Sequence, residues 1–106
     1  MSEQARQLRA IVFSDVVDSS VKIFADELIA IQRIKEDLSL IRDAVKSHGG
    51  LLVKSLGDGL LVTFDGPTQA LQFIQSAIQE LSARGRQSLA HRFGLHTGEI
   101  LSLIHI

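Results

Sequence analysis

Two aspartates occupy positions at which a carboxylate could hold a metal ion. Asp15 lies within Ile11-Val-Phe-Ser-Asp-Val-Val-Asp-Ser-Ser20, and Asp58 lies within Val53-Lys-Ser-Leu-Gly-Asp-Gly59. Each follows or interrupts an apolar stretch, so each is expected at a strand boundary. Carboxylate oxygens suit Mg²⁺ or Mn²⁺ better than zinc, and two such ions can assist an in-line phosphoryl displacement.

The turn that follows Asp15 is a candidate anion site. It leads directly into a predicted helix, and free backbone N–H groups at a helix N-terminus bind anions such as a triphosphate. The candidate triphosphate-binding residues are Val17, Ser19 and Ser20. The ordinary alternative is that Asp15 and Asp18 cap a helix or turn and that Asp58 is an Asp-Gly hairpin residue.

The composition indicates one globular domain. The chain has 106 residues, of which 45% are hydrophobic and 22% are charged, and its net charge is -1. We therefore expect no strong electrostatic attraction to nucleic acid or to an anionic membrane. The chain has no cysteine, no apolar run long enough for a bilayer span and no signal-peptide pattern at its start, so we expect a cytoplasmic protein.

Five segments would have to position the two carboxylates. The predicted elements, in chain order, are a strand at Leu8–Ser14, a long amphipathic helix over Val21–His48 that breaks near Ala25–Glu27, a hairpin over Leu51–Phe64, a helix that starts at Asp65–Pro67, and a strand at His91–Thr97. Gly49 and Gly50 are expected to end the first helix, and Asp58 is expected at the hairpin tip. On the long helix, Asp37 is assigned to the polar side of the apolar stripe.

This order of elements predicts an α+β fold, a ferredoxin-like antiparallel sheet with both helices on one face. In that topology the first strand runs antiparallel to the second arm of the hairpin. The end of the first strand then meets the start of the third, so Asp15 and Asp58 are expected at one edge of the sheet.

Three segments, in their order and spacing, resemble the catalytic domain of class III adenylate and guanylate cyclases. They are Ala10-Ile-Val-Phe-Ser-Asp-Val-Val-Asp-Ser-Ser20, His48-Gly-Gly-Leu-Leu-Val-Lys-Ser-Leu-Gly-Asp-Gly-Leu-Leu-Val-Thr-Phe64 and Phe93-Gly-Leu-His-Thr-Gly-Glu-Ile100. The resemblance covers roughly Arg9 to Ile100. It implies the nucleotide cyclase fold, whose core is ferredoxin-like.

The resemblance also implies roles for individual residues. Asp15 and Asp58 match the pair that ligates two Mg²⁺ or Mn²⁺ ions, with the backbone carbonyl of Val16 as a further ligand. Lys54 matches the lysine that contacts adenine, which favours ATP as the substrate. The implied reaction is attack of the ribose 3′-hydroxyl on the α-phosphorus, which gives 3′,5′-cyclic AMP and pyrophosphate. The family works as a head-to-tail homodimer, in which one subunit supplies the metals and the other supplies Lys54.

The sequence departs from the family pattern at two places. Many members have Gly-Phe-Thr where this chain has Asp18-Ser-Ser20, which adds a negative charge near the expected triphosphate. The family's later segment, with a second adenine contact and an asparagine and arginine that stabilise the transition state, is not reached. Residues 1–100 are therefore expected to be a partial catalytic domain, inactive alone.

The last six residues are expected to be a non-native tail. Leu101-Ser-Leu-Ile-His-Ile106 is what CTG TCT CTT ATA CAC ATC encodes, which resembles a transposon-end sequencing adapter. The alternative is that these residues form a real edge strand, which their composition allows.

Two other functions fit part of the pattern. A non-catalytic nucleotide-binding or dimerisation module, derived from a degenerate cyclase, would share the fold. A diguanylate cyclase or polymerase would share the palm-like arrangement, but the hairpin here is Ser-Leu-Gly-Asp-Gly rather than Gly-Gly-Asp/Glu-Glu-Phe.

Overall fold

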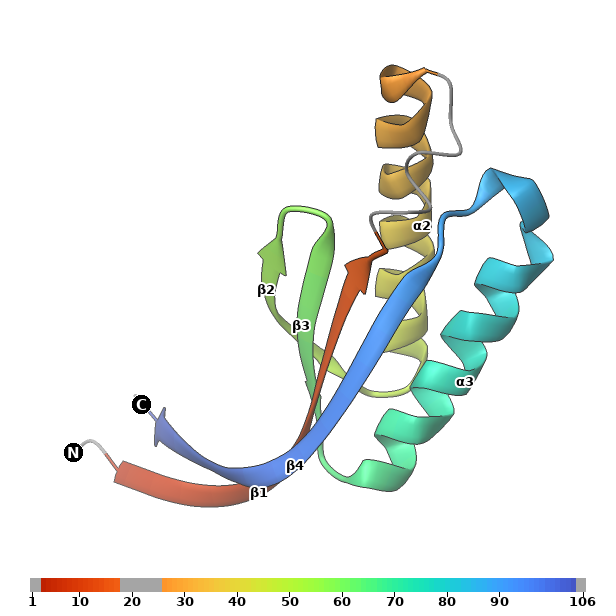
Figure 1. The fold of residues 1–106 in the computed structure, drawn as a ribbon. Helices are drawn as coiled ribbons and strands as arrows, with labels where there is room; N and C mark the ends of the chain where they lie inside the picture. The colour runs from red at the N-terminus through yellow and green to blue at the C-terminus, as the bar shows by residue number, and fades with distance from the viewer. Residues whose placement is uncertain (1–2, 18–25, 105–106) are drawn as a thin grey trace.

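The described residues, 3–17 and 26–104 of the computed structural model, form a four-stranded antiparallel sheet covered by two helices. The strands are β1 (Glu3–Val16), β2 (Leu51–Leu56), β3 (Gly59–Phe64) and β4 (His91–Ile104), in the spatial order β2-β3-β1-β4. The helices α2 (Glu27–Ser47) and α3 (Pro67–Ala83) lie on the same side of the sheet (Figure 1), and a short 3₁₀ turn, η1 (Gly85–Gln87), precedes β4. The predicted α+β fold is confirmed.

Local sequence signals account for the helix boundaries. The side chain of Asp26 accepts a hydrogen bond from the backbone N–H of Leu28 at 2.9 Å, which caps the start of α2. The helix ends before Gly49, whose φ of 72° is a conformation that glycine adopts at little cost. The predicted start at Val21 lies outside the described residues, and the predicted break coincides with the Asp26 cap. At α3, Pro67 occupies the first turn, as expected.

The β2–β3 hairpin closes with the two-residue turn Gly57-Asp58. Gly57 has a φ of 59°, and no non-glycine residue in the described part of the chain has a positive φ. Glycine at the first central position is typical of a type II′ turn, whose twist matches that of the flanking strands. Asp58 therefore lies at the hairpin tip, as predicted, and its side chain is exposed.

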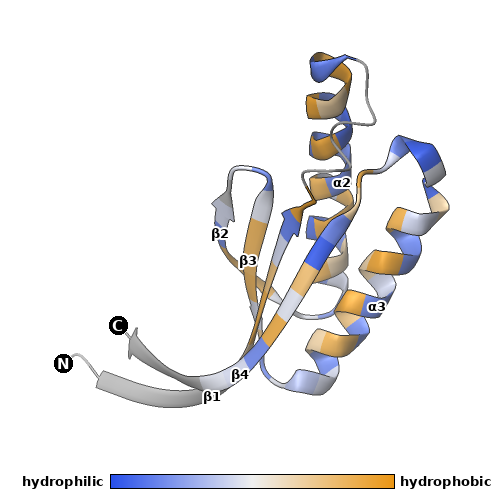
Figure 2. Cartoon of the chain, viewed as in Figure 1, coloured by the Kyte–Doolittle hydropathy of each residue, from blue (hydrophilic) through white to orange (hydrophobic). Residues whose placement is uncertain are grey.

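The core lies between the sheet and the two helices. Its largest fully buried apolar side chains are Phe64, Phe73, Ile41, Leu60, Val12 and Val62. Hydrophobic and hydrophilic residues alternate along both helices (Figure 2). On α3, Phe73 is buried whereas Leu71 and Ile78 are about half exposed, at 51% and 48%. Ala70, Ala77 and Leu81 are buried together with Phe73, so Leu71 and Ile78 lie at the border of the buried face of α3.

The strands β1 and β4 are both longer than predicted. Beyond the part of β1 that pairs with β3, the two strands continue as a ribbon with a register from Arg9↔Gly98 to Glu3↔Ile104 (Figure 1). Backbone pairing therefore includes residues 101–104, as in the edge-strand alternative. The prediction of a non-native tail concerns the origin of these residues and stays a prediction.

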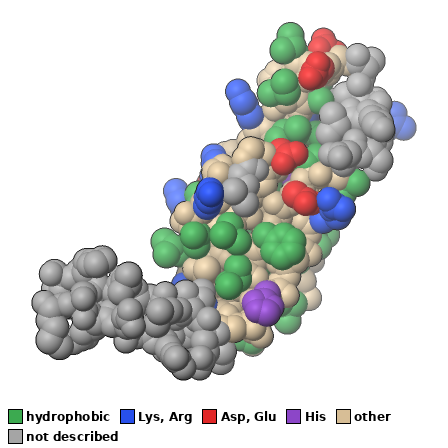
Figure 3. Space-filling view, turned by 60° about the vertical axis from the view of Figure 1, so that its left-hand side comes forward, with side chains coloured by type: hydrophobic (Ala, Val, Ile, Leu, Met, Phe, Trp, Pro, Cys, Tyr) green, Lys and Arg blue, Asp and Glu red, His purple; other side chains and the backbone are tan. Residues whose placement is uncertain are grey.

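Neither helix covers the other face of the sheet. It carries exposed apolar side chains, among them Phe13 (49%), Leu51 (62%) and Val53 (53%). In Figure 3, hydrophobic side chains gather at the middle of the surface, with acidic and basic side chains at one border and a histidine at the other. Among the described helices, none is both long and apolar enough to cross a bilayer.

Candidate functional site

Asp15 lies at the end of β1 and faces the uncovered side of the sheet. It is directly opposite Arg92 of β4 in the antiparallel register. The guanidinium of Arg92 donates Nε–H to Oδ1 of Asp15 at 2.9 Å and Nη2–H to Oδ2 at 3.2 Å. Both side chains are accessible, with 44% of Asp15 and 68% of Arg92 exposed. The carboxylate is thus ordered and remains within reach of a ligand from solvent.

Asp58 is brought to the same end of the sheet by the contact of its neighbour with β1. Ser14 pairs with Leu60, so the next step of this antiparallel register puts Gly59 beside Asp15. A Cβ on Gly59 would lie 2.2 Å from the carbonyl oxygen of Ser14 and 3.5 Å from Cα of Asp15. Only glycine fits there. The backbones that carry Asp15 and Asp58 therefore meet, as the strand order predicts.

Lys54 of β2 lies on the same face as Asp15. Its row across the sheet crosses β1 at Phe13, two residues before Asp15. Lys54 pairs with Leu61, Leu61 pairs with Phe13 and Phe13 pairs with Gly94, so these residues form one row across the sheet. A β-bulge between Leu52 and Lys54 shifts the register of β2 at this point. The Phe13 ring covers Gly94, where a Cβ would come within 2.1 Å of it. Lys54 itself is exposed.

The residues that follow Asp15 are partly described. The side chain of Val16 is buried, so this residue can reach a ligand only through its backbone. The N–H of Val17 donates to the carbonyl oxygen of Ala90 at 2.8 Å, which fixes the start of the turn to β4. Because that N–H is already bonded, Val17 would have to contact a triphosphate by another atom or after a rearrangement. Ser19 and Ser20 lie outside the described residues.

The donor set fits a hard divalent cation. Asp15 and Asp58 supply carboxylate oxygens at one accessible sheet end, and the nearby His91, which pairs with Val16, is bonded to Asp37 instead. Within residues 3–17 and 26–104, no group of three or more His, Cys, Asp or Glu residues could hold an ion. An ion bound here would therefore complete its coordination with backbone carbonyl, water or substrate oxygens, as Mg²⁺ commonly does.

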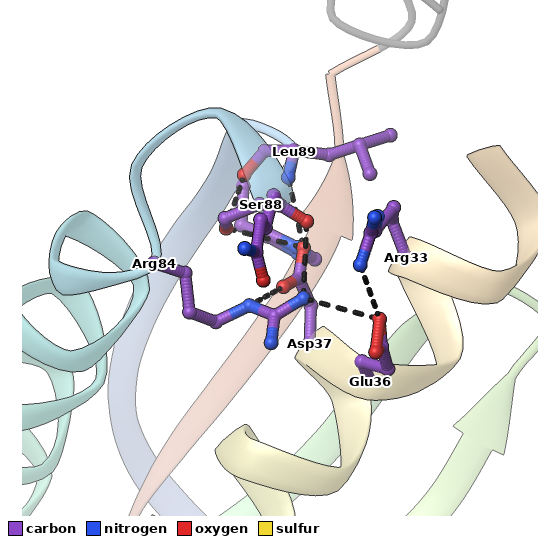
Figure 4. Close-up of polar contacts among 8 residues, drawn as sticks. Arg33, Glu36, Asp37, Arg84, Ser88 and Leu89 are labelled. Atoms are coloured by element: carbon purple, nitrogen blue, oxygen red, sulfur yellow. Dashed lines mark hydrogen bonds and ion pairs between the residues drawn. The ribbon is translucent and has the colours of Figure 1, made fainter. Parts of the chain in front are cut away.

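A second polar cluster lies on the helix side of the sheet and was not predicted. Asp37 of α2 is completely buried and accepts four hydrogen bonds (Figure 4). The donors are Nε of Arg84 at 2.8 Å, Oγ of Ser88 at 3.2 Å, the backbone N–H of Leu89 at 2.9 Å and Nε2 of His91 at 3.0 Å. The assignment of Asp37 to the polar side of the helix was therefore wrong.

Burial alone raises the pKa of Asp37, but its partners outweigh that effect. The hydrogen bonds from His91 and the Leu89 N–H, together with the positive charges of His91 and Arg84, hold the pKa of Asp37 below its usual value. The carboxylate therefore stays ionised and ties α2 to the start of β4. Since His91 immediately precedes Arg92, this cluster also fixes the backbone from which Arg92 reaches Asp15.

Sequence signals for these missed residues do exist. Asp37 lies three residues after Ile34 and four before Ile41, which is the spacing of the buried stripe and not of the polar face. Its burial therefore could have been inferred together with a need for cationic partners. Arg92 stands next to the strand-start histidine, but nothing in the spacing identifies its partner. Only the β1–β4 register does so.

A hollow in the described part of the chain lies away from the candidate metal ligands. It has a volume of about 840 Å³ and is bounded by the end of α3, η1 and the first residues of β4. Its lining is mainly apolar, with Ile78, Leu81 and Phe93, and includes none of the candidate metal or triphosphate residues. We therefore place the candidate site at the sheet end, where Asp15, Arg92 and the hairpin turn that carries Asp58 lie close together, next to the row that contains Lys54.

Solved structures of nucleotide cyclases share this fold. A bacterial light-regulated adenylyl cyclase aligns over 93% of this chain and 33% of its own, with a TM-score of 0.79 and 20% identity. An adenylate/guanylate cyclase/hydrolase from Silicibacter pomeroyi aligns over 98% of this chain and 66% of its own, with a TM-score of 0.78 and 26% identity.

A third structure with this fold is dimeric. The non-canonical dimeric guanylyl cyclase domain of a rhodopsin fusion protein from Blastocladiella emersonii aligns over 95% of this chain and 63% of its own, with a TM-score of 0.74 and 18% identity. This chain thus spans from one third to about two thirds of these three proteins. No protein-family model and no curated protein matches the sequence. The chain has the fold of adenylyl and guanylyl cyclase catalytic domains, as its resemblance predicts.

Proposed function

We propose that residues 1–100 are part of a class III nucleotide cyclase catalytic domain, and that the complete domain converts ATP into 3′,5′-cyclic AMP and pyrophosphate. The observation that carries this proposal is the close approach of β1 and β3 at Gly59, next to Asp15 on one strand and to Asp58 on the other, within the fold of nucleotide cyclases. Neither carboxylate is used elsewhere as a buried structural group.

In this proposal the two carboxylates hold Mg²⁺ or Mn²⁺, with the Val16 carbonyl as a further ligand. The ions supply activation of the ribose 3′-hydroxyl and charge compensation for the leaving pyrophosphate. Asp15 and Asp58 orient the substrate by fixing the point at which its phosphates are held. Residues 17–20 would receive the triphosphate, with Ser19 and Ser20 as candidate contacts.

Arg92 extends the proposed site beyond the residues that the sequence indicates. Its guanidinium lies against Asp15, so it is the nearest described cation to the oxygens of a substrate phosphate bound at that carboxylate. Arginine recognises both carboxylate and phosphate through paired N–H groups. We therefore include Arg92 as a candidate phosphate-binding residue.

Lys54 is the proposed adenine contact. Its exposed position on the open face fits a base that approaches from outside the protomer that binds the metals. A head-to-tail homodimer would supply that arrangement, with Lys54 of one protomer facing the carboxylates of its partner. The exposed apolar side chains of the same face, Phe13, Leu51 and Val53, are available for such a contact.

The central test uses the parent protein that carries this chain. With Mn²⁺ and ATP it is expected to form cyclic AMP, and Asp15→Ala and Asp58→Ala are each expected to lower the rate by at least about a hundredfold. Asp43→Ala, an exposed carboxylate on α2, is the matched control and should leave the rate unchanged. Full activity in either site variant would contradict the two-metal assignment.

The alternative function, a non-catalytic nucleotide-binding or dimerisation module, gives a different result in the same assay. Such a protein would bind ATP with Mn²⁺ in a manner that depends on Asp15 and Asp58, yet form no cyclic AMP. The 106-residue chain alone is expected to behave in this way even if the parent protein is active, because the proposed partial domain lacks the segment expected to stabilise the transition state.

A further inference from the structure

The ion pair between Asp15 and Arg92 occupies the atoms that a metal ion would need. Both carboxylate oxygens of Asp15 accept hydrogen bonds from the guanidinium, at 2.9 Å and 3.2 Å. A bidentate arginine places one donor on each carboxylate oxygen, and each oxygen keeps a second lone pair. A divalent ion that binds Asp15 must therefore either share the carboxylate with the Arg92 guanidinium or displace it.

The backbone of Arg92 is fixed, whereas its side chain is accessible. The preceding residue, His91, is bonded to the buried Asp37 at 3.0 Å, and Gly94 lies under the ring of Phe13. The side chain of Arg92 is 68% exposed. The guanidinium can therefore leave Asp15 by rotation of exposed side-chain bonds, which takes nanoseconds or less and requires no movement of β4.

The charge of Arg92 cannot be removed by deprotonation at any ordinary pH. A bound divalent ion would place two further positive charges beside it, and like charges at this distance repel. We infer that the Asp15–Arg92 ion pair is the resting state of the proposed metal site, and that a divalent cation binds Asp15 by displacing the Arg92 guanidinium. This inference rests on the proposed function, in which Asp15 is a metal ligand.

The competition makes metal binding and release of Arg92 a single event. The guanidinium becomes available at the sheet end only when an ion has taken its place on Asp15. Because exposed ion pairs are weak, the competition reduces metal affinity by at most about fivefold. That is large enough to measure and small enough for millimolar Mg²⁺ to overcome.

The first experiment measures Mn²⁺ binding to the 106-residue chain by isothermal titration calorimetry, without nucleotide. Arg92→Gln is expected to lower the Kd for Mn²⁺ by about two- to fivefold, since the competing cation is gone. Arg92→Lys keeps the charge without the paired donors, so its Kd for Mn²⁺ should lie between those of the unmodified chain and of Arg92→Gln. Arg86→Gln removes an exposed arginine of η1 that does not contact Asp15 and should leave the Kd unchanged. Circular dichroism would verify that every variant keeps the fold.

The second experiment follows the arginine directly by NMR. In the unmodified chain, addition of diamagnetic Mg²⁺ should shift the Nε–H resonance of Arg92, whereas the same resonance in Asp15→Asn should not respond. Arg33 serves as the reference, since its Nη1 pairs with Glu36 on α2. The Nε–H resonance of Arg33 should not shift.

The outcomes separate the two proposals. Suppose that Asp15→Asn abolishes Mn²⁺ binding and that Arg92→Gln leaves the affinity for Mn²⁺ equal or weaker. The proposed displacement of Arg92 is then wrong, whereas the proposed metal site is supported. If the unmodified chain and Arg92→Gln both bind no Mn²⁺, or if binding does not depend on Asp15, the proposed metal site is wrong and the displacement fails with it.

Discussion

The carboxylate of Asp37 contributes to stability through four hydrogen bonds that it accepts inside the protein. Its partners come from the end of α3, from the connection after η1 and from the start of β4. A buried carboxylate without such partners would be costly. Asp37 therefore connects α2 to a stretch of the chain that lies 47 to 54 positions away and leads directly into the strand that carries Arg92.

We expect Asp37→Asn to lower the free energy of unfolding by about 2 to 4 kcal/mol, because it leaves Arg84 without a buried counter-charge and forces an amide N–H₂ against other donors. Urea unfolding followed by circular dichroism would measure this loss. Asp43→Asn on the exposed side of the same helix is the control, with an expected change below about 0.5 kcal/mol. Equal effects of the two substitutions would contradict the structural role of Asp37.

The stabilising effect of Asp37 should also depend on pH. Since its pKa is lowered on folding, the unfolded state takes up a proton first as the pH falls. The contribution is complete above the ordinary aspartate pKa of about 3.9 and is lost as the pH falls through the lower pKa of the folded state. Urea unfolding between pH 7 and pH 3 should thus show the gap between the unmodified chain and Asp37→Asn narrowing below about pH 4. If the difference in free energy of unfolding widened as the pH fell, the pKa of Asp37 would be raised on folding and not lowered.

Ser14 presents the opposite case. Its hydroxyl is buried and has no hydrogen-bond partner among the described residues. We expect Ser14→Ala to leave the free energy of unfolding unchanged or to raise it by up to about 1 kcal/mol, since removal of an unsatisfied polar group offsets the small loss of packing. A loss of more than about 1 kcal/mol in urea unfolding would mean that the hydroxyl is bonded in solution.

At the scale of elements, the contact between the start of β3 and the end of β1 determines the geometry of the site. A methyl group on Gly59 would collide with the carbonyl oxygen of Ser14. We expect Gly59→Ala to cost about 1 to 3 kcal/mol and to weaken Mn²⁺ binding by separating the two strand ends, both measurable on one sample by urea unfolding and calorimetry. Gly66→Ala, where a Cβ meets nothing within 4 Å, should cost less than about 1 kcal/mol and leave metal binding intact.

The elements that the sequence predicts best are those with strong local signals. Gly49 and Gly50 end α2, Pro67 starts α3 and Gly57-Asp58 closes the hairpin, because each meets a backbone requirement within a few residues. The meeting of Asp15 and Asp58 followed from strand order alone. These parts of the fold depend on neighbours in the chain or on topology, and both can be predicted from the sequence.

The features that escaped prediction depend on partners far away in sequence. The outer halves of β1 and β4 have no clean alternation, and each extends because the other pairs with it. The burial of Asp37 requires Arg84 and His91, which come from the other half of the chain. Likewise, no local pattern indicates a role for Arg92, and only the β1–β4 register places it opposite Asp15. Pairwise contacts of this kind cannot be read from the local pattern.

At the scale of the whole molecule, the uncovered sheet face makes the state of assembly testable. If the proposed homodimer forms through this face, sedimentation equilibrium of the parent protein should show a monomer–dimer equilibrium that Phe13→Ser shifts toward monomer by about tenfold or more in Kd. Leu71→Ser, an equally exposed substitution on α3, is the control on the opposite side. A dimer that responds only to Leu71→Ser would place the interface on the helix side.

The register between β1 and its neighbours also limits how the chain can change length. A one-residue insertion between Ala10 and Asp15 would turn Asp15 toward the core and a neighbouring apolar side chain toward solvent, because successive strand residues face opposite sides. The connection from α3 through η1 to β4 has a requirement of its own, because Arg84, Ser88 and Leu89 in it bond the buried Asp37. Insertions and deletions among relatives of this chain should therefore gather in the other connecting segments and be absent from the part of β1 that leads to Asp15.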